Sequence, residues 1–355
     1  MENNINTSFR HGSNCFDLLR HAAAYMVLFS HHFALSGFSE PKIFDSTTSL
    51  GGFAVIVFFS ISGYLITGSL LNSKSLKSYF IKRIFRIFPG LIVCSLVMTV
   101  FIFPFYGLNQ TPVAWLGSLN SIKSFVYFSF FGSPGAGDLV NGFTSNYIFQ
   151  DSANGSLWSL KFEFFDYIAI AVIFLFFKKN LTASISFLLL SFAALMINNT
   201  FHISDYYLYR TATYSIPFAI GALLYSTKHV WINSRKYRAF MIAIPTIILL
   251  VNSFVSDKQS LSPVTIAMVP IIIITLGLSF HDPLIKGRFD ISFGVYIYAF
   301  PIQQIMINYI HGHFLLTIAI SVLLTTSFAT LSWIVVEKRF LLKNNRLFIK
   351  HKIIS

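Results

Sequence analysis

16-FDLLRHAAAYMVLFSHHFAL-35 is an apolar segment with the length of a membrane span, and it carries Asp17, Arg20 and His31 at helical spacing. Eleven residues separate Arg20 from His31, so an α-helix places both on one stripe, about 16 Å apart along its axis. Asp17, three residues before Arg20, joins this stripe. Charged groups that face lipid cost several kcal/mol. The stripe is therefore expected to face a protein interior or a wet cavity.

Apolar segments of this length recur along the whole chain. The 355 residues are 55% hydrophobic and only 11% charged, which excludes an ordinary soluble domain. The pattern predicts an all-α, polytopic membrane protein with about ten transmembrane helices around a central polar cavity. The expected spans are 16–38, 50–71, 81–104, 156–177, 182–199, 208–226, 239–254, 263–280, 291–310 and 315–336.

The net charge of +13 is distributed asymmetrically. With the amino terminus inside and ten alternating spans, 21 of the 26 Lys and Arg residues fall on the inside, as the positive-inside rule requires. Nucleic-acid binding would instead need a soluble basic face. We expect one membrane domain over 1–355, N-in and C-in. Residues 1–15 and the basic 337–355 are its expected cytoplasmic tails.

The segment 105–155 is expected to form a long outside loop. Its most apolar part, 122-IKSFVYFSFFG-132, is short and polar for a span and is a candidate re-entrant or interfacial segment. A full crossing here would turn the later basic clusters outward and violate the charge rule. Loops of this length in compact proteins are usually functional.

Motifs for metals and nucleotides are absent from the sequence. There is no CxxC, HExxH, Walker loop or dinucleotide fingerprint, so no metal site and no permanently bound cofactor is expected. Cys15 at the inner face and Cys94 in the third span are not expected to form a disulfide.

The stretch 82-KRIFRIFP-89 places Arg83 and Arg86 on one helix face at the cytoplasmic end of the third span. One interpretation is anchoring, because Lys and Arg extend to lipid headgroups. The other is a clamp for a phosphate or diphosphate, whose oxygens match the guanidinium fork.

The stretch 156-SLWSLKFEFFDY-167 carries Glu163 and Asp166 one turn apart, just inside the outer end of the fourth span. A structural interpretation pairs a buried carboxylate with Lys161 or Arg210. A functional role is favoured, because carboxylates at membrane depth usually mark a site.

Two other spans and one histidine also stand out. The glycine- and serine-bearing 51-GGFAVIVFFSISGYL-65 is expected to serve close helix packing. The span 291-ISFGVYIYAFPIQQI-305, with its proline and two glutamines, is expected to border a cavity. His32 is interpreted as an outer-interface residue without a nameable partner, whose replacement would be mild.

As an ordered set, these motifs resemble the integral-membrane acyltransferase-3 family. The matching pieces are Asp17-x-x-Arg20-x10-His31, 57-VFFSISGYLI-66 with Ser62 and Gly63, Arg83-x-x-Arg86 before Pro89, Trp158-Ser159-Leu160 followed by Glu163 and Tyr167, and 332-SWIVVEKRFL-341. The sequence departs from the pattern in three places. Glycines that are common after the aspartate and the arginine are missing, and Asp166 stands where an aromatic residue is usual. Ala299 replaces a histidine that is a candidate catalytic group, so His31 becomes the main candidate.

The resemblance implies a membrane O-acyltransferase of the bacterial inner (cytoplasmic) membrane. Members most often move an acetyl group from cytoplasmic acyl-CoA to hydroxyls of surface polysaccharides, lipopolysaccharides, peptidoglycan or small molecules. For this chain the expected reaction takes acetyl from cytoplasmic acetyl-CoA, a substrate and not a bound cofactor, to a cell-surface glycan such as an O-antigen, capsule or exopolysaccharide. The expected partners are acyl-CoA, a surface or lipid-linked glycan, and membrane lipids.

The resemblance also implies roles for individual residues. His31 is expected to act as base, because an unperturbed pKa near ~6.5 suits proton removal from a sugar hydroxyl, or as acyl acceptor. Glu163 either orients a histidine tautomer or binds the acceptor. The expected catalytic residues are His31, Arg20 and Glu163, the donor-binding residues are Arg83, Arg86 and Arg20, and the supporting residues are Asp17, Trp158, Ser159, Tyr167, Ser62 and Gly63.

Two other functions compete with acyl transfer. A proton-coupled transporter or flippase of a lipid-linked glycan would also need intramembrane Asp, Arg, His and Glu. The absence of an inverted repeat and of paired broken helices speaks against it. A polysaccharide polymerase would need basic residues on the outer loop to hold a diphosphate, and 105–155 has only Lys123.

Overall fold

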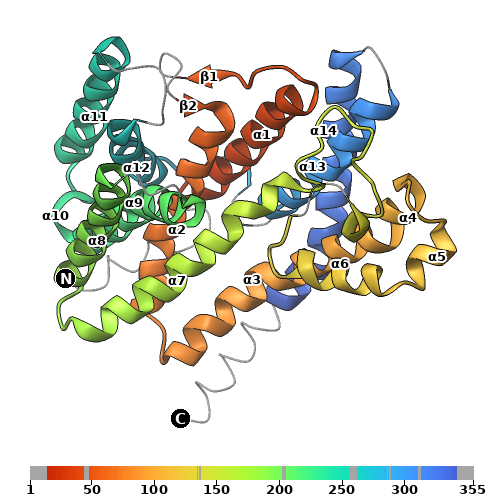
Figure 1. The fold of residues 1–355 in the computed structure, drawn as a ribbon. Helices are drawn as coiled ribbons and strands as arrows, with labels where there is room; N and C mark the ends of the chain where they lie inside the picture. Colours follow the sequence, from red (N-terminus) through yellow and green to blue (C-terminus); the bar gives the residue numbers. More distant parts are fainter. Residues whose placement is uncertain are drawn as a thin grey trace. The chain divides into compact units, whose positions relative to one another are not determined.

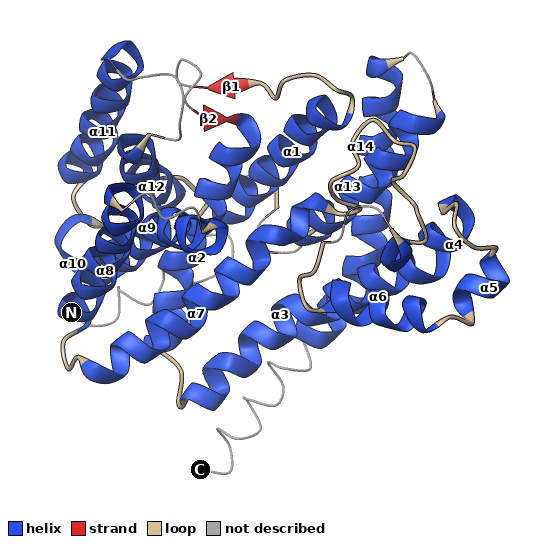
Figure 2. Ribbon diagram, in the orientation of Figure 1, coloured by secondary structure: helices blue, strands red, loops and turns tan. Residues whose placement is uncertain are grey.

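The computed structural model is almost entirely helical (Figure 1). It describes residues 14–43, 48–133, 135, 137–201, 205–255, 262–285, 287, 289–310 and 313–341. The strands in this part of the chain are β1 (Lys42–Ile43) and β2 (Thr48–Ser49), which pair antiparallel (Figure 2). The prediction of an all-α protein is confirmed, whereas most of the two predicted tails lies outside the described residues.

Each of the ten predicted spans contains a long helix. These are α1 (Phe16–Leu35), α2 (Leu50–Leu71), α3 (Leu76–Val97), α7 (Trp158–Phe176), α8 (Asn180–Thr200), α9 (Tyr206–Ser226), α11 (Arg235–Val255), α12 (Pro263–Ser279), α13 (Ser292–Tyr309) and α14 (Phe314–Ser332). A π-helical turn, Met98–Ile102, continues α3 into α4 (Phe103–Tyr106), and a similar turn, Trp333–Glu337, follows α14. α3 and α11 begin several residues before the predicted spans, because polar residues extend a helix beyond its apolar core.

Five helical segments are long and apolar enough to cross a membrane, judged by length and composition. They are Leu50–Leu71, Leu76–Tyr106, Asn180–Thr200, Arg235–Phe254 and Phe314–Leu341. α12 is apolar but shorter. Of the remaining four helices, α1 and α7 carry the ionisable residues that the sequence marks as a site, and these residues make both helices less typical of a span by composition. The chain is thus a helical membrane protein, and the other five spans stay a prediction.

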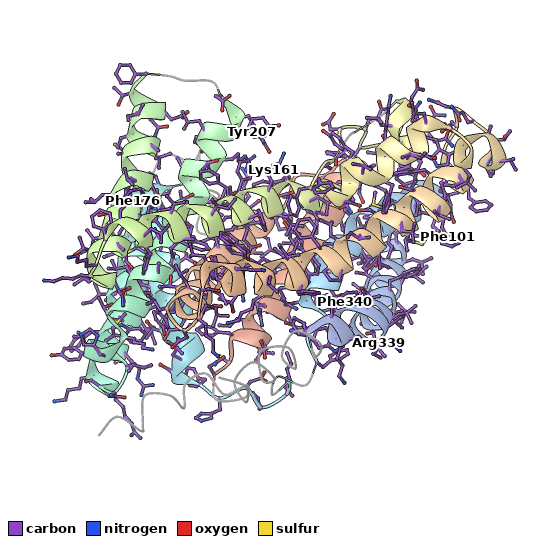
Figure 3. The ribbon with its side chains drawn as sticks, turned by 90° about the horizontal axis from the view of Figure 1, so that it is seen from below. Phe101, Lys161, Phe176, Tyr207, Arg339 and Phe340 are labelled. Atoms are coloured by element: carbon purple, nitrogen blue, oxygen red, sulfur yellow. The ribbon has the colours of Figure 1, made fainter. Side chains whose placement is uncertain are left out.

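Large apolar side chains cover the outsides of these helices. Phe101, in the π-helical turn after α3, is 59% exposed, and Phe176, at the end of α7, is 79% exposed (Figure 3). Exposed aromatic rings in such numbers would be a liability in water. They are what a surface in contact with lipid requires.

The region 105–155 folds into short helices. α5 (Pro112–Leu116) and α6 (Leu119–Ser129) are followed by the single turns Asp138–Val140 and Gly155–Leu157. α6, the longest, has eleven residues and spans about 16 Å, roughly half of a hydrocarbon core of about 30 Å. No helix in the described part of this region is therefore long enough to cross a bilayer.

The described chain contacts divide the protein into two compact units. The first contains Met1–Met26, Pro41–Leu76 and Phe162–Phe289, and the second contains Val27–Glu40, Lys77–Lys161 and Asp290–Ser355. α1 and α7 each contribute residues to both units. The prediction of one membrane domain over 1–355 stays a prediction.

Glycines set the packing of the first unit, in which α9 packs against α2, α8 and α12. A Cβ on Gly63 would overlap the backbone carbonyl of Phe218, and a Cβ on Gly221 would overlap the backbone of Ser60. Small residues that let two backbones touch are the usual means of helix association in membranes. The prediction that 51–65 serves close packing is confirmed.

In the second unit, α13 packs against α14 and against the turn Gly155–Leu157. The amide of Gln304 donates to the carbonyls of Phe149 and Ser152, at 3.0 and 3.1 Å. The amide of Gln303 donates to the carbonyl of Leu28 at 2.8 Å. Both glutamines are fully buried. They fasten the end of the 105–155 region and α1 to α13.

Candidate functional site

Glu163 on α7 accepts hydrogen bonds from two hydroxyl groups of the first unit. The Ser62 hydroxyl on α2 donates to its Oε1, and the Tyr167 hydroxyl, one turn along α7, donates to the same oxygen at 2.5 Å. Gly63, next to Ser62, holds α2 against Phe218 of α9. Four of the predicted site residues therefore meet here, and the orientation of the carboxylate is set by its two hydroxyl partners.

Asp166 lies one turn from Glu163 and has a different environment. It is fully buried, and Oδ1 accepts a hydrogen bond from the Ser215 hydroxyl of α9 at 2.5 Å. Both carboxylates are thus bonded by hydroxyls, whereas one interpretation of the sequence pairs them with Lys or Arg. Asp166 ties α7 to α9. It does not join the hydroxyls around Glu163.

Asp17 and Arg20 form an ion pair in the first turn of α1. A terminal nitrogen of Arg20 donates to Oδ1 of Asp17, and both side chains are mostly buried. The carboxylate also interacts favourably with the amino-terminal end of the helix dipole. The shared face that the sequence predicts for the two residues is confirmed.

His31 lies on the same helix as Arg20, because α1 is continuous from Phe16 to Leu35. Its ring packs edge-on against Phe300 of α13, with ring centroids 5.2 Å apart. Phe149 packs against the same Phe300 ring at 5.9 Å. The Nδ1 atom of His31 is buried and has no hydrogen-bond partner among the residues that the structure describes. The second unit thus holds an imidazole whose Nδ1 forms no hydrogen bond to a described residue.

His32 has a role that the sequence did not indicate. It is fully buried, and its Nε2 lies 3.1 Å from the Thr317 hydroxyl of α14. Its Nδ1 lies 3.2 Å from the amide nitrogen of Gln303. Because that amide is a donor, the network assigns the proton to Nε2 and makes the ring neutral. The prediction of an interface residue without a partner was wrong. His32 joins three helices of the second unit.

Arg86 on α3 forms an ion pair with a residue that the sequence analysis missed. Its terminal nitrogen donates to Oδ2 of Asp290 at 2.7 Å. The other oxygen of Asp290 accepts from the Ser292 hydroxyl at 2.6 Å, at the start of α13. An acidic residue immediately before a span, on the side predicted to be cytoplasmic, was the available signal. Arg83 is partly buried one turn before Arg86.

A second carboxylate lies at this end of the second unit. Glu337, in the last π-helical turn, is 2% exposed and accepts a hydrogen bond from the Ser332 hydroxyl at 2.9 Å. It also interacts electrostatically with Arg86. A guanidinium has five N–H donors, so the bond to Asp290 leaves donors for a further anion.

The motif residues on α7 are divided between the two units. The Ser159 hydroxyl shares a hydrogen bond of 2.6 Å with the hydroxyl of Tyr296 on α13, in the second unit. Trp158, beside it, is partly buried. Glu163 and Tyr167 belong to the first unit. One short motif thus makes contacts in both units.

Both cysteines are free and buried. Burial raises the pKa of the Cys15 thiol, which keeps it protonated at neutral pH. The described residues contain no group of three or more His, Cys, Asp and Glu side chains placed to hold a metal ion.

Comparisons with known proteins show to which family the chain belongs. The family model of the acyltransferase-3 domain, described as an acyltransferase domain, matches residues 13–337. The chain is 35% identical over 349 residues to an O-acetyl transferase of Shigella phage Sf6, covering 94% of this chain and 98% of the relative. It is 28% identical over 357 residues to Nodulation protein 10 of Rhizobium leguminosarum bv. viciae, covering 92% of each chain. No solved structure matches it.

The family match encloses every motif residue from Asp17 to Glu337, including the ion pairs and the hydroxyl-bonded carboxylate. It covers far more than half of the chain. This protein therefore belongs to the acyltransferase-3 family and is an acyltransferase.

Proposed function

We propose that this acyltransferase moves an acetyl group from cytoplasmic acetyl-CoA to a hydroxyl of a cell-surface glycan. The similarity to an O-acetyl transferase over nearly the whole chain supports the acyl group and the O-linked product. The observation that carries the proposal is the buried Nδ1 of His31, which has no partner among the described residues and lies on the helix that carries the Asp17–Arg20 pair.

In the proposed reaction, His31 acts as the general base. A neutral imidazole nitrogen takes the proton of the sugar hydroxyl as the sugar oxygen attacks the thioester carbonyl. The new C–O bond forms, the C–S bond breaks, and the proton passes from the imidazolium to the leaving thiolate of CoA. The packing against Phe300 fixes the plane of the ring. A route through an acyl-histidine would use the same residue.

The arginines are proposed to bind the donor. CoA carries phosphates, and planar guanidinium groups bind phosphate through two parallel hydrogen bonds. Arg20 lies near the start of α1, and Arg83 and Arg86 lie in the middle of α3 but near the start of the predicted span 81–104, so all three lie towards the predicted cytoplasmic ends of their spans. Glu163, with its two hydroxyl partners in the first unit, is assigned to the acceptor.

The directions of packed helices in the first unit support the alternation of the predicted spans, and the side of the membrane comes from the positive-inside rule. α2 and α9 run parallel, because Gly52 lies near Tyr209 at their amino-terminal ends and Gly63 meets Phe218 further along both helices. In the alternating scheme these are the second and sixth spans. They are parallel only if 105–155 does not add a single crossing.

Contacts within the second unit agree with the same scheme. The Arg86–Asp290 pair joins the middle of α3 to the residues just before α13, and both helices are predicted to leave the cytoplasm. The His32–Thr317 contact joins the end of α1 to the start of α14, both predicted to be outside. These contacts support the predicted grouping of helix ends on the two sides of the membrane, and the donor and acceptor roles require the N-in and C-in orientation of that grouping.

Cysteine labelling tests this topology. In a variant without Cys15 and Cys94, Ala114→Cys is expected to react with a membrane-impermeant thiol reagent applied to spheroplasts. Asn233→Cys should react only after permeabilisation, because it lies in a basic loop predicted to be cytoplasmic. Both positions are exposed in the structure. Labelling of Asn233→Cys from outside would mean that 105–155 contains a crossing, and the proposed roles of the helix ends would be wrong.

The reaction itself is tested on the surface glycan. Deletion of the gene is expected to lower the mass of each modified repeat by one acetyl group, with chain length and surface display unchanged. Mass spectrometry of the glycan from the deletion strain, the wild type and a complemented strain measures this. A truncated or intracellular glycan in the deletion strain would contradict acetyl transfer and favour a flippase.

A further inference from the structure

A polar cavity of about 230 Å³ lies between the amino-terminal ends of α2 and α9, within the first unit. It is lined by Thr48, Ser49, Gly52, Tyr209, Arg210, Thr213 and Tyr214. All these residues belong to the described part of the chain, and none is a motif residue of the candidate site. The cavity therefore needs an explanation of its own.

Two threonine hydroxyls at this cavity lack a hydrogen-bond partner. Thr48 is 3% exposed and Thr213 is 1% exposed. The Oγ1 atom of each is buried and has no partner among the residues that the structure describes. Leaving a buried hydroxyl unbonded costs free energy. Two such groups lining one cavity indicate a ligand whose own hydroxyls form the hydrogen bonds that the threonines lack.

Arg210 adds a cation to the same cavity. A terminal nitrogen of its guanidinium donates to the Tyr214 hydroxyl at 3.3 Å, and the guanidinium lies 5.3 Å from the centroid of the Tyr206 ring. This is the end of α9 that the charge rule predicts to be outside, where basic residues are disfavoured. An ionisable residue within a membrane helix usually marks a site.

We propose that this cavity binds one sugar unit of the acceptor glycan. A sugar hydroxyl both donates and accepts hydrogen bonds. Sugar hydroxyls can therefore bond to the hydroxyls of Thr48 and Thr213 and accept a hydrogen bond from Arg210. Tyr209 and Tyr214 add aromatic side chains to the same lining. The volume is below the roughly 300–1,000 Å³ of pockets for drug-sized ligands, which suits a single sugar unit.

This assignment rests on the proposed function and names the acceptor side of the same reaction. The glycan would approach from outside, and the cavity lies where α2 and α9 are predicted to begin on that side. Glu163 also belongs to the first unit and bonds to α2 through Ser62. The cavity and the Glu163–Ser62 hydrogen bond together assign acceptor binding to α2, α7 and α9.

Two variants and a matched control test the assignment. Thr213→Val keeps the side-chain shape and removes a hydroxyl without a described partner, so the folded state should be as stable as the wild type or more so. Arg210→Gln removes the charge. The control, Thr211→Val, changes the same residue type on the same helix at a partly exposed position outside the cavity lining.

The measurement is the transfer of labelled acetyl from acetyl-CoA by the purified full-length protein in liposomes. The acceptor is glycan isolated from the deletion strain, which is unmodified. For Thr213→Val the KM for glycan is expected to rise about tenfold, the equivalent of one lost hydrogen bond. Arg210→Gln should raise it further. The kcat and the affinity for acetyl-CoA should stay at the wild-type value, because a KM change alone reports lost ground-state binding.

The possible outcomes separate this assignment from the proposed function. A wild-type KM for glycan in both variants would show a water-filled cavity and overturn the assignment alone. Binding of inorganic phosphate to the wild-type protein that is lost in Arg210→Gln, with the glycan KM unchanged in that variant, would make the cavity an anion site and also overturn the assignment. No transfer to glycan by the wild type would overturn the proposed function and this assignment with it.

Discussion

His31→Ala is expected to abolish acyl transfer while the protein still inserts and folds. The substitution removes the proposed base, and general base catalysis typically contributes about 10²–10⁴-fold to a rate. The His31 side chain makes an edge-on contact with Phe300, and its buried nitrogen has no described hydrogen bond to lose. The measurement is the transfer rate of purified protein together with its melting temperature in detergent.

His32→Ala is the matched comparison on the neighbouring position. Because His32 is fully buried and bonded to Gln303 and Thr317, its loss should lower the melting temperature. The transfer rate per folded molecule should stay near the wild-type value. Substantial transfer by His31→Ala, or a greater loss of rate in His32→Ala, would remove His31 from the role of base.

Arg83→Lys and Arg86→Lys are each expected to weaken acetyl-CoA binding by about tenfold or more. Lysine keeps the charge but cannot reproduce the two parallel hydrogen bonds of a guanidinium to phosphate. In Arg86→Lys the ammonium still faces Asp290, so the ion pair that joins α3 to α13 should survive. Equilibrium binding of acetyl-CoA to the purified protein measures the effect.

The control for these variants is Arg339→Lys, an exposed arginine near the carboxyl-terminal end of the described chain (Figure 3). It should bind acetyl-CoA as the wild type does. If Arg83→Lys and Arg86→Lys also bind normally, both arginines are anchors. Arg86 would then serve only the structural ion pair with Asp290.

Local patterns in the sequence predicted local features of the structure. Apolar runs predicted the ten helices, because hydropathy is a property of each side chain and can be read from a local stretch of sequence. The spacing of Asp17 and Arg20 predicted their shared helix face, because helical geometry is fixed. The small residues of 51–65 predicted close packing, and Gly63 indeed touches the backbone of Phe218.

Features that depend on distant segments were not predicted. Asp290 lies 204 residues from Arg86, and no local pattern selects it from the other acidic residues. The burial of His32 depends on Gln303 and Thr317, which come from two later helices. The threonines of the proposed acceptor cavity belong to no motif. Their significance comes only from unbonded hydroxyls, which a sequence does not display.

The contact at Gly63 has a consequence for redesign of acceptor choice. Its neighbour Ser62 holds the carboxylate of Glu163, so a side chain at position 63 would push α2 from α9 and displace that serine. The cavity residues lie three helical turns away, towards the start of α2. Variant libraries that seek new acceptors should therefore vary Thr48 and Thr213 freely. They should keep Gly63 invariant, since its contact with Phe218 sets the position of α2 against α9.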